Sequence, residues 1–321
     1  MTDALFTMME EVLEAVPRSP HPTNKIAAGI VFDDEHNLVK TNEWPHIIDE
    51  KIGRDTKIGN SSGTLHAETN ALFHSPLPTE GAAMFITDPF CPNCAKNIVE
   101  GGIKTIYIDR DGFNRDFFKR RGNHFEEMSM RIAEQAGVCV YALNSEDKTI
   151  KTIWEPPENY TPPIDNPMSI EEIKEANDSV FSTLLKAGKE KSDGKKYAVA
   201  LAKNQKNQLF SLIAAAHIVE GFTIQDKRQT VELLSKPSKY SFIQEPVNRM
   251  MMQLARHGLT LIDGYLYCSQ VPTSREQVNM VGAGIESIHI GNDQKCRDDF
   301  GFEAKKLLSS KNIIEYLNMQ E

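Results

Sequence analysis

The chain has 321 residues, of which 40% are hydrophobic and 25% charged, an ordinary globular composition at a length that suits two domains. The net charge of −9 argues against a broad basic surface for duplex nucleic acid, while a local basic pocket stays compatible with it. No apolar run reaches the roughly 18–20 residues that cross a bilayer, and the acidic N-terminus differs from a signal peptide.

Helices and strands alternate along the first half. The predicted elements are a helix at 3–16, a hairpin at 25–42 with a polar turn at 33–37, a helix at 65–75, a strand at 81–88, a helix at 91–102, a strand at 103–109, a helix in the second half of 118–137 and a strand at 138–143. Strands separated by helices indicate an α/β fold whose sheet is partly parallel and covered on both faces.

The second half repeats this pattern. Residues 154–168 contain five prolines and are expected to be a linker between domains at 1–153 and 169–321. Residues 25–39 align with 196–210 without a gap, and 101–108 align with 283–290. We therefore expect a tandem duplication of one fold.

The cysteines point to a metal rather than to disulfides. An odd count of five, with one close pair at Cys91 and Cys94, indicates reduced thiols and a cytoplasmic protein. A C-x-x-C pair alone is also compatible with a redox site, and a closed zinc site would need a fourth ligand, for which Cys139 and His74 qualify only by residue type.

His66 and Glu68, together with the C-x-x-C pair, fit the pattern of a catalytic zinc site. His66, Cys91 and Cys94 supply three zinc ligands and leave the fourth position open, as catalytic zinc sites do. Residues two apart on a helix point about 200° away from each other, so Glu68 is not expected to be a ligand. Glu68 is therefore expected to transfer protons.

The sequences HAE at 66–68 and CPNC at 91–94 resemble the zinc-dependent cytidine/deoxycytidylate deaminase superfamily, whose signature is H-x-E followed by P-C-x-x-C. The resemblance implies a three-layer α-β-α sandwich with a mixed five-stranded sheet, present here twice. One departure is that Phe90, rather than proline, precedes Cys91, with Pro89 one step earlier. The loop before the cysteine helix is therefore expected to differ in shape.

The resemblance also implies roles for individual residues. Zn²⁺ is expected on His66, Cys91 and Cys94, with Glu68 as the proton shuttle. The family pattern also places the backbone of Ala67 at the base and Asn42 at the sugar. Apart from the resemblance, Trp44 is expected as a pocket wall, and Lys119, Arg120 or Arg121 at a phosphate, because an acidic protein that uses nucleotides needs local positive charge. Each role has a structural alternative. Asn42 could be a turn residue and Trp44 a core or exposed residue, and the basic residues at 119–121 could form a solvated helix start.

The second copy lacks the signature. The alignment places Thr273 opposite Cys91, Glu276 opposite Cys94 and Ile213 opposite Asn42, and the stretch around Glu245 contains no His. Without these ligands the second domain is expected to be non-catalytic.

The leading hypothesis is hydrolytic deamination of a free cytosine nucleotide or nucleoside, most like dCMP or CMP, to the uracil product and ammonia. The alternatives are deamination of guanine or a pteridine-like ring, a nucleic-acid-editing or nucleic-acid-binding protein, and a zinc-stabilised sensor. The acidic charge disfavours nucleic acid, and the intact Glu68 disfavours a sensor. We expect no membrane partner and a homo-oligomer, most simply a dimer.

Overall fold

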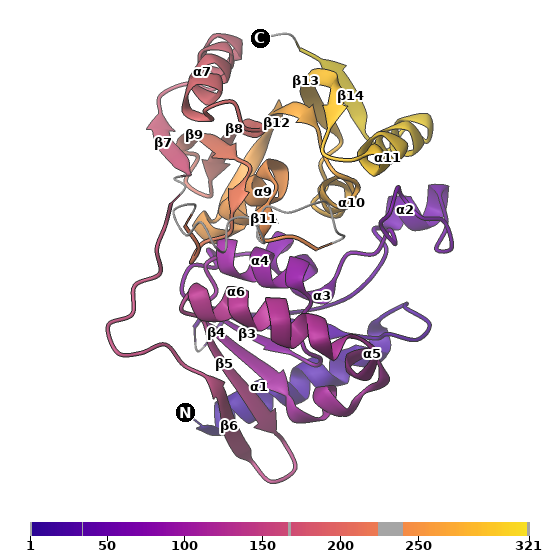
Figure 1. Ribbon diagram of the computed structural model, residues 1–321, viewed down its shortest axis with the longest axis vertical. Helices are drawn as coiled ribbons and strands as arrows, with labels where there is room; N and C mark the ends of the chain where they lie inside the picture. The colour runs from indigo at the N-terminus through magenta and orange to yellow at the C-terminus, as the bar shows by residue number, and fades with distance from the viewer. Residues whose placement is uncertain (1, 34, 166–167, 224–239, 320–321) are drawn as a thin grey trace. The chain divides into compact units, whose positions relative to one another are not determined.

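The computed structural model describes residues 2–33, 35–165, 168–223 and 240–319. They form two compact units, each drawing on both halves of the chain (Figure 1). The first unit comprises the described residues of Met1–Glu43, His66–Asp165 and Ile218–Phe242, and the second those of Trp44–Leu65, Asn166–His217 and Ile243–Glu321. Residues 155–165, in the Pro-rich stretch, contain no helix or strand.

The first unit is built on a six-stranded sheet with the order β2-β1-β3-β4-β5-β6. Its strands are β1 (Ala27–Val31), β2 (Asn37–Thr41), β3 (Ala83–Ile86), β4 (Thr105–Asp109), β5 (Cys139–Asn144) and β6 (Thr149–Trp154). Strand β1 is antiparallel to both β2 and β3, β3 to β5 are parallel, and β6 is antiparallel to β5. The partly parallel sheet expected from the sequence is confirmed.

Helices cover both faces of this sheet, which gives three layers (Figure 1). Helix α1 (Thr2–Ala15) packs on one face, where a Cβ at Gly29 would lie 2.4 Å from Met8 and 2.7 Å from Val12. Helices α3 (Ala67–Phe73), α4 (Pro92–Glu100) and α6 (Met130–Gln135) lie on the other face. The remaining turns and helices are η1 (Val16–Arg18), η2 (Arg110–Asn114), α5 (Asp116–His124) and the π-helical η3 (Phe125–Ser129).

Two local expectations are corrected. The sheet has six strands rather than five, because the largely exposed residues of β6 pair with the edge of β5 although they show no buried apolar run. The helical region after Asn114 begins at Asp116 rather than midway through 118–137, and its first turn carries Asp116, whose charge favours a helix start.

The second unit contains another six-stranded sheet, with the order β14-β13-β12-β8-β9-β7. Its elements are α2 (His46–Lys51), β7 (Ser169–Ile173), α7 (Asp178–Lys191), β8 (Tyr197–Asn204), β9 (Leu209–Ala215), α9 (Pro246–His257), β12 (Leu259–Val271), α10 (Ser274–Gly282), β13 (Ser287–Cys296), α11 (Asp299–Ser310) and β14 (Glu315–Asn318). The short strands β10 (His217–Ile218) and β11 (Ile243–Gln244) form a separate pair. Among the helices of the described ranges, none is both long and apolar enough to cross a membrane.

The two sheets share one topology. The order β9-β8-β12-β13-β14 repeats β2-β1-β3-β4-β5, with the same antiparallel and parallel pairings at every step. Helix α9 follows the hairpin as α3 does, and α10 links two parallel strands as α4 does. The predicted tandem duplication of one fold is therefore confirmed.

The strand register corrects the gapless alignment. Ala28 pairs with Ile86 in the first unit, and Ala198 pairs with Cys268 in the second. The position of Ile26 is thus taken by Lys196, and that of Asn42 by Ala216 rather than Ile213, because Ala216 N–H donates to Lys196 as Asn42 N–H donates to Ile26. The alignment slips because β8 and β9 have 8 and 7 residues where β1 and β2 have five each.

Candidate active site

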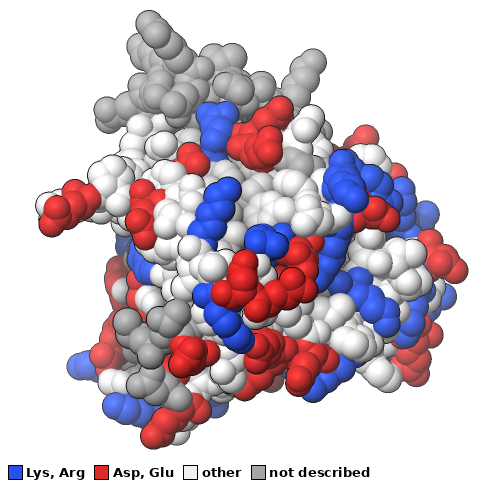
Figure 2. Space-filling view, turned by 90° about the horizontal axis from the view of Figure 1, so that it is seen from below, with Lys and Arg blue, Asp and Glu red and all other residues white. Residues whose placement is uncertain are grey.

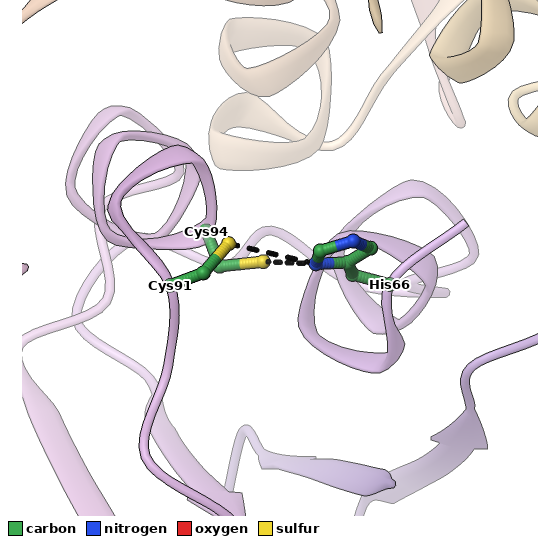
Figure 3. A group of neighbouring side chains, drawn as sticks. All are labelled: His66, Cys91 and Cys94. Atoms are coloured by element: carbon green, nitrogen blue, oxygen red, sulfur yellow. Dashed lines mark hydrogen bonds between the residues drawn. The ribbon is translucent and has the colours of Figure 1, made fainter. Parts of the chain in front are cut away.

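Three potential metal ligands converge in the first unit (Figure 3). Nδ1 of His66 lies 3.2 Å from Sγ of Cys94 and 3.6 Å from Sγ of Cys91. The ligand atoms of the three residues all lie within 4.8 Å of one another, and theirs is the one such group of three or more His, Cys, Asp or Glu found in the described ranges. Cys139 and His74 are not part of it.

Helix starts position these ligands. His66 is the extended N-cap residue of α3, and Cys91 is the extended N-cap residue of α4, with Pro92 in the first turn. Cys94 follows one turn later on α4. The partial positive charge of a helix N-terminus favours thiolates, and the hydrogen bond with Cys94 lowers the pKa of the Cys91 thiol well below its ordinary value.

The geometry of the cluster fits zinc. Zn–S and Zn–N bonds of about 2.3 and 2.0 Å in a tetrahedral site place a nitrogen and a sulfur ligand about 3.5 Å apart. The observed separations of 3.2 and 3.6 Å are close to this value. Imidazole and two thiols form a typical zinc donor set, and three protein ligands leave one coordination position for water or substrate.

Glu68 lies in the first turn of α3 and is 4% exposed. Burial raises the pKa of its carboxyl to about 7, with smaller effects from His66 and Cys91. A carboxyl that titrates near neutrality can both accept and donate a proton, which suits general acid–base catalysis. The helix start therefore presents a potential metal ligand and a buried carboxyl two residues apart.

An arginine braces the loop that leads to Cys91. Arg115 contacts Asp88 at 2.7 Å and Asp109 at 3.0 Å, and donates to the carbonyl oxygen of Thr87 at 3.0 Å. Burial raises the pKa of both carboxyls, although Arg115 opposes the shift. The sequence analysis missed these residues; their signal is a polar side chain at the carboxyl ends of two neighbouring parallel strands, β3 and β4.

A basic cavity of about 640 Å³ lies in the same unit. It is lined by Thr23, Asn24, Lys25, Ile26, Asp88, Arg115, Asp116, Lys119 and Arg120. Lys119 and Arg120 were expected at a phosphate, and Arg120 donates to Asn24 at 3.2 Å across this lining. The lining carries four basic and two acidic side chains. The side chain of Arg121 lies outside the described part of the structure.

Asn42 is hydrogen-bonded to two residues that line this cavity, Asn24 and Ile26. Its amide oxygen accepts from Ile26 N–H and from the Ser19 hydroxyl, both at 2.8 Å, and its amide nitrogen donates to the Asn24 carbonyl at 2.8 Å. Within the described ranges these are the hydrogen bonds of the amide group, and one of its two N–H groups makes none. Its role at a sugar stays a prediction.

Ala67, Trp44 and Phe90, the other residues singled out in the sequence, do not line the basic cavity. Ala67 is fully buried between His66 and Glu68 at the start of α3. Trp44 belongs to the second unit, where Arg54 lies 5.4 Å from its ring centroid, and its role as a pocket wall stays a prediction. Phe90, the departure from the signature, is buried and packs edge-to-face on Phe125 at 5.3 Å. An aromatic cluster thus supports the loop before Cys91.

Surface charge is mixed rather than of one sign. On the face displayed in Figure 2, basic and acidic side chains are interspersed. Such a surface lacks the continuous positive field that tracks a polynucleotide backbone.

No family model matches the chain, but individual proteins do. A protein described as "Uncharacterized deaminase in luxG 3'region", from Aliivibrio fischeri, is 31% identical over 122 residues, which are 38% of this chain and 81% of that protein. ComE operon protein 2 of Bacillus subtilis strain 168 is 32% identical over 90 residues, 27% of this chain and 42% of that protein.

Two solved structures are also similar. The dCMP deaminase of cyanophage S-TIM5, in complex with dCMP and dUMP, has 22% identity and a TM-score of 0.33, over 44% of this chain and 97% of that one. Acinetobacter baumannii RibD has 19% identity and a TM-score of 0.32, over 44% of this chain and 36% of that one.

Proposed function

Because the chain belongs to the cytidine/deoxycytidylate deaminase superfamily and is a deaminase, we propose that it hydrolyses the amino group of a free cytosine nucleotide or nucleoside, most like dCMP or CMP. The observation that carries this proposal is the convergence of His66, Cys91 and Cys94 beside the buried Glu68. A cluster that served only stability would have no use for an acid–base group.

His66, Cys91 and Cys94 would hold zinc. When bound, zinc supplies the Lewis acidity that makes water nucleophilic near neutral pH. The protein contributes fixed ligand positions at two helix starts and a loop braced by Arg115. These contacts keep the two thiols and the imidazole in place before a substrate arrives.

Glu68 would move the protons. The water oxygen forms a bond to C4 of the base while Glu68 accepts the water proton and delivers it to N3. Glu68 then takes the remaining hydroxyl proton and transfers it to the amino group, the C4–N bond breaks, and ammonia leaves the uracil product. Its burial supports this role, because a pKa near 7 lets one carboxyl act in both directions.

The basic cavity would receive the phosphate. Lys25, Lys119 and Arg120 bring positive charge to its lining, and a charge-assisted contact to a phosphate is stronger than a neutral hydrogen bond. Asn42 would hold the sugar through its remaining amide N–H, and the backbone of Ala67 would bond the base. This placement supports a free nucleotide rather than a polynucleotide.

A substrate panel tests the proposal. The zinc-loaded protein would be assayed for ammonia release from cytosine, deoxycytidine, dCMP, CMP and dCTP, alongside guanine, a pteridine and single-stranded oligonucleotides. We expect turnover of cytosine compounds, with a monophosphate preferred over its nucleoside. Preference for guanine or the pteridine would show that cytosine is not the base of the substrate. Preference for an oligonucleotide would indicate a nucleic-acid-editing protein.

A further inference from the structure

The second unit contains a buried lysine held by two carboxylates. Nζ of Lys196 lies 2.9 Å from Oε2 of Glu276 and 3.1 Å from Oε2 of Glu245. The three side chains are 7%, 0% and 9% exposed, respectively. Few lysines are buried so completely, because removing an ammonium group from water costs several kcal/mol unless anions replace the solvent.

These carboxylates occupy the positions of the metal ligands. Glu245 is the N-cap residue of α9, as His66 is of α3. Thr273 is the N-cap residue of α10, as Cys91 is of α4, and Glu276 follows three residues later, as Cys94 does. The two helices therefore bring Glu245 and Glu276 to the places of His66 and Cys94.

The sheet brings the lysine to the same place. Tyr197 N–H donates to the Ser269 hydroxyl at 3.0 Å, which repeats the bond from Ala27 N–H to the Thr87 hydroxyl at 3.2 Å. Lys196, one residue before Tyr197, thus stands where Ile26 lines the basic cavity of the first unit. Its side chain extends from that position to the two carboxylates.

We infer that the ammonium group of Lys196 is a built-in cation that replaces the metal ion in the second unit. Among the described residues, these two carboxylates form ion pairs with two cations, because Arg297 also contacts Glu245, at 3.0 Å. In the first unit, the charges of two cysteine thiolates and one Zn²⁺ ion would balance in the same way. The inference concerns the fold of the second unit and holds whichever substrate the first unit uses.

The remaining contacts that the described residues make engage both carboxylate oxygens of Glu276. Glu276 also accepts from Val247 N–H at 2.9 Å, from Thr273 N–H at 2.7 Å and from the Thr273 hydroxyl at 3.0 Å. Burial works to lower the pKa of Lys196, but Glu276 and Glu245 outweigh it and hold that pKa well above its ordinary value. The lysine stays charged across the physiological range.

Charge removal is the first test. In the full chain, Lys196→Met leaves two carboxylates facing one cation, and we expect the thermal midpoint of the second unit to fall by about 10 °C. Adding Glu276→Gln alone removes the uncompensated charge, because Arg297 still pairs with Glu245, and should recover much of this loss. An unchanged midpoint in Lys196→Met, or a double variant less stable than the single one, would overturn the inference.

Site reversal is the second test, and it needs no enzymatic activity. The variant Lys196→Ile, Glu245→His, Thr273→Cys, Glu276→Cys restores the three ligand types and removes the lysine. We expect its zinc content to rise from one to two per chain. The matched control carries Ser in place of Cys at position 276 and should stay at one. A folded reversal variant that still binds one zinc would show that these positions do not correspond to a metal site.

Discussion

In the first unit, the helices that flank the central strands begin at His66 and Cys91; in the second, the corresponding helices begin at Glu245 and Thr273. Both pairs of helix starts surround a place suited to a cation. A soft donor set in the first unit suits zinc, and a hard, hydrogen-bonded carboxylate pair in the second holds an ammonium group. The fold sets the position of the cation site, and the side chains determine which cation it suits.

The two places also differ in acid–base chemistry. Glu68 stands two residues after the N-cap of α3, and Val247 stands two residues after the N-cap of α9. Valine cannot move a proton, so the position in the second unit that corresponds to Glu68 has no acid–base group. The comparison predicts that chemistry is confined to the first unit, and four changes test this.

The largest effect is expected for Cys91→Ser. A serine hydroxyl is a poor zinc ligand, so the metal content should fall from one per chain towards zero, and activity with it. Hydrogen exchange should show lost protection in α3 and α4, while α9 and α10 stay protected. The control Cys139→Ser, outside the cluster, should keep its metal. Equal loss of protection in both units would contradict separate cation sites.

The next effect concerns proton transfer. Glu68→Gln keeps the shape of the side chain but cannot accept a proton, so we expect activity to fall by about 10²–10⁴-fold while zinc content and fold persist. The exposed Glu35→Gln is the matched control and should behave as wild type. Activity within tenfold of wild type would remove Glu68 from its proposed role.

A smaller effect is expected in the basic cavity. Replacing Lys119 and Arg120 by Ala removes two of its positive charges and should raise KM for a monophosphate by roughly tenfold or more. The KM of the parent nucleoside should stay unchanged, since it has no phosphate. Lys151→Ala, on the exposed strand β6, is the control. An equal rise for both substrates would place the phosphate elsewhere.

The smallest effect concerns a helix cap. Thr273 and Glu276 form a capping box at the start of α10, whereas Cys91 makes no side-chain cap bond at the start of α4. Thr273→Ala should therefore cost about 1 kcal/mol and lower the unfolding midpoint of the second unit by about 2–4 °C. Zinc content should not change. A loss of zinc in this variant would mean that the second unit contributes to metal binding.

Much of this protein was predictable from the sequence. The spacing of His66, Cys91 and Cys94 identified the cluster, because these residues lie at the starts of two helices that follow β2 and β3, strands that run in the same direction and end at one edge of the sheet. Helix geometry separated Glu68 from the ligands. Apolar patterning gave the hairpin, the parallel strands and the duplication, since each depends on local periodicity.

Other features depend on contacts between distant residues, and only the tertiary structure decided them. The exposed strand β6 joins the sheet by edge pairing with β5, which its own pattern does not reveal. Trp44, close to Asn42 in sequence, belongs to the other unit.

Lys196 in the second unit shows most clearly why local sequence patterns do not predict such contacts. Lys196 and Glu276 are 80 residues apart, and a gapless alignment puts Lys196 opposite Lys25 rather than Ile26. Local patterning cannot detect the longer strands of the second hairpin, because lengthening a hairpin leaves the alternation of its side chains unchanged. The register against β12 fixes where the lysine points, and that register is set by backbone hydrogen bonds between strands far apart in the chain.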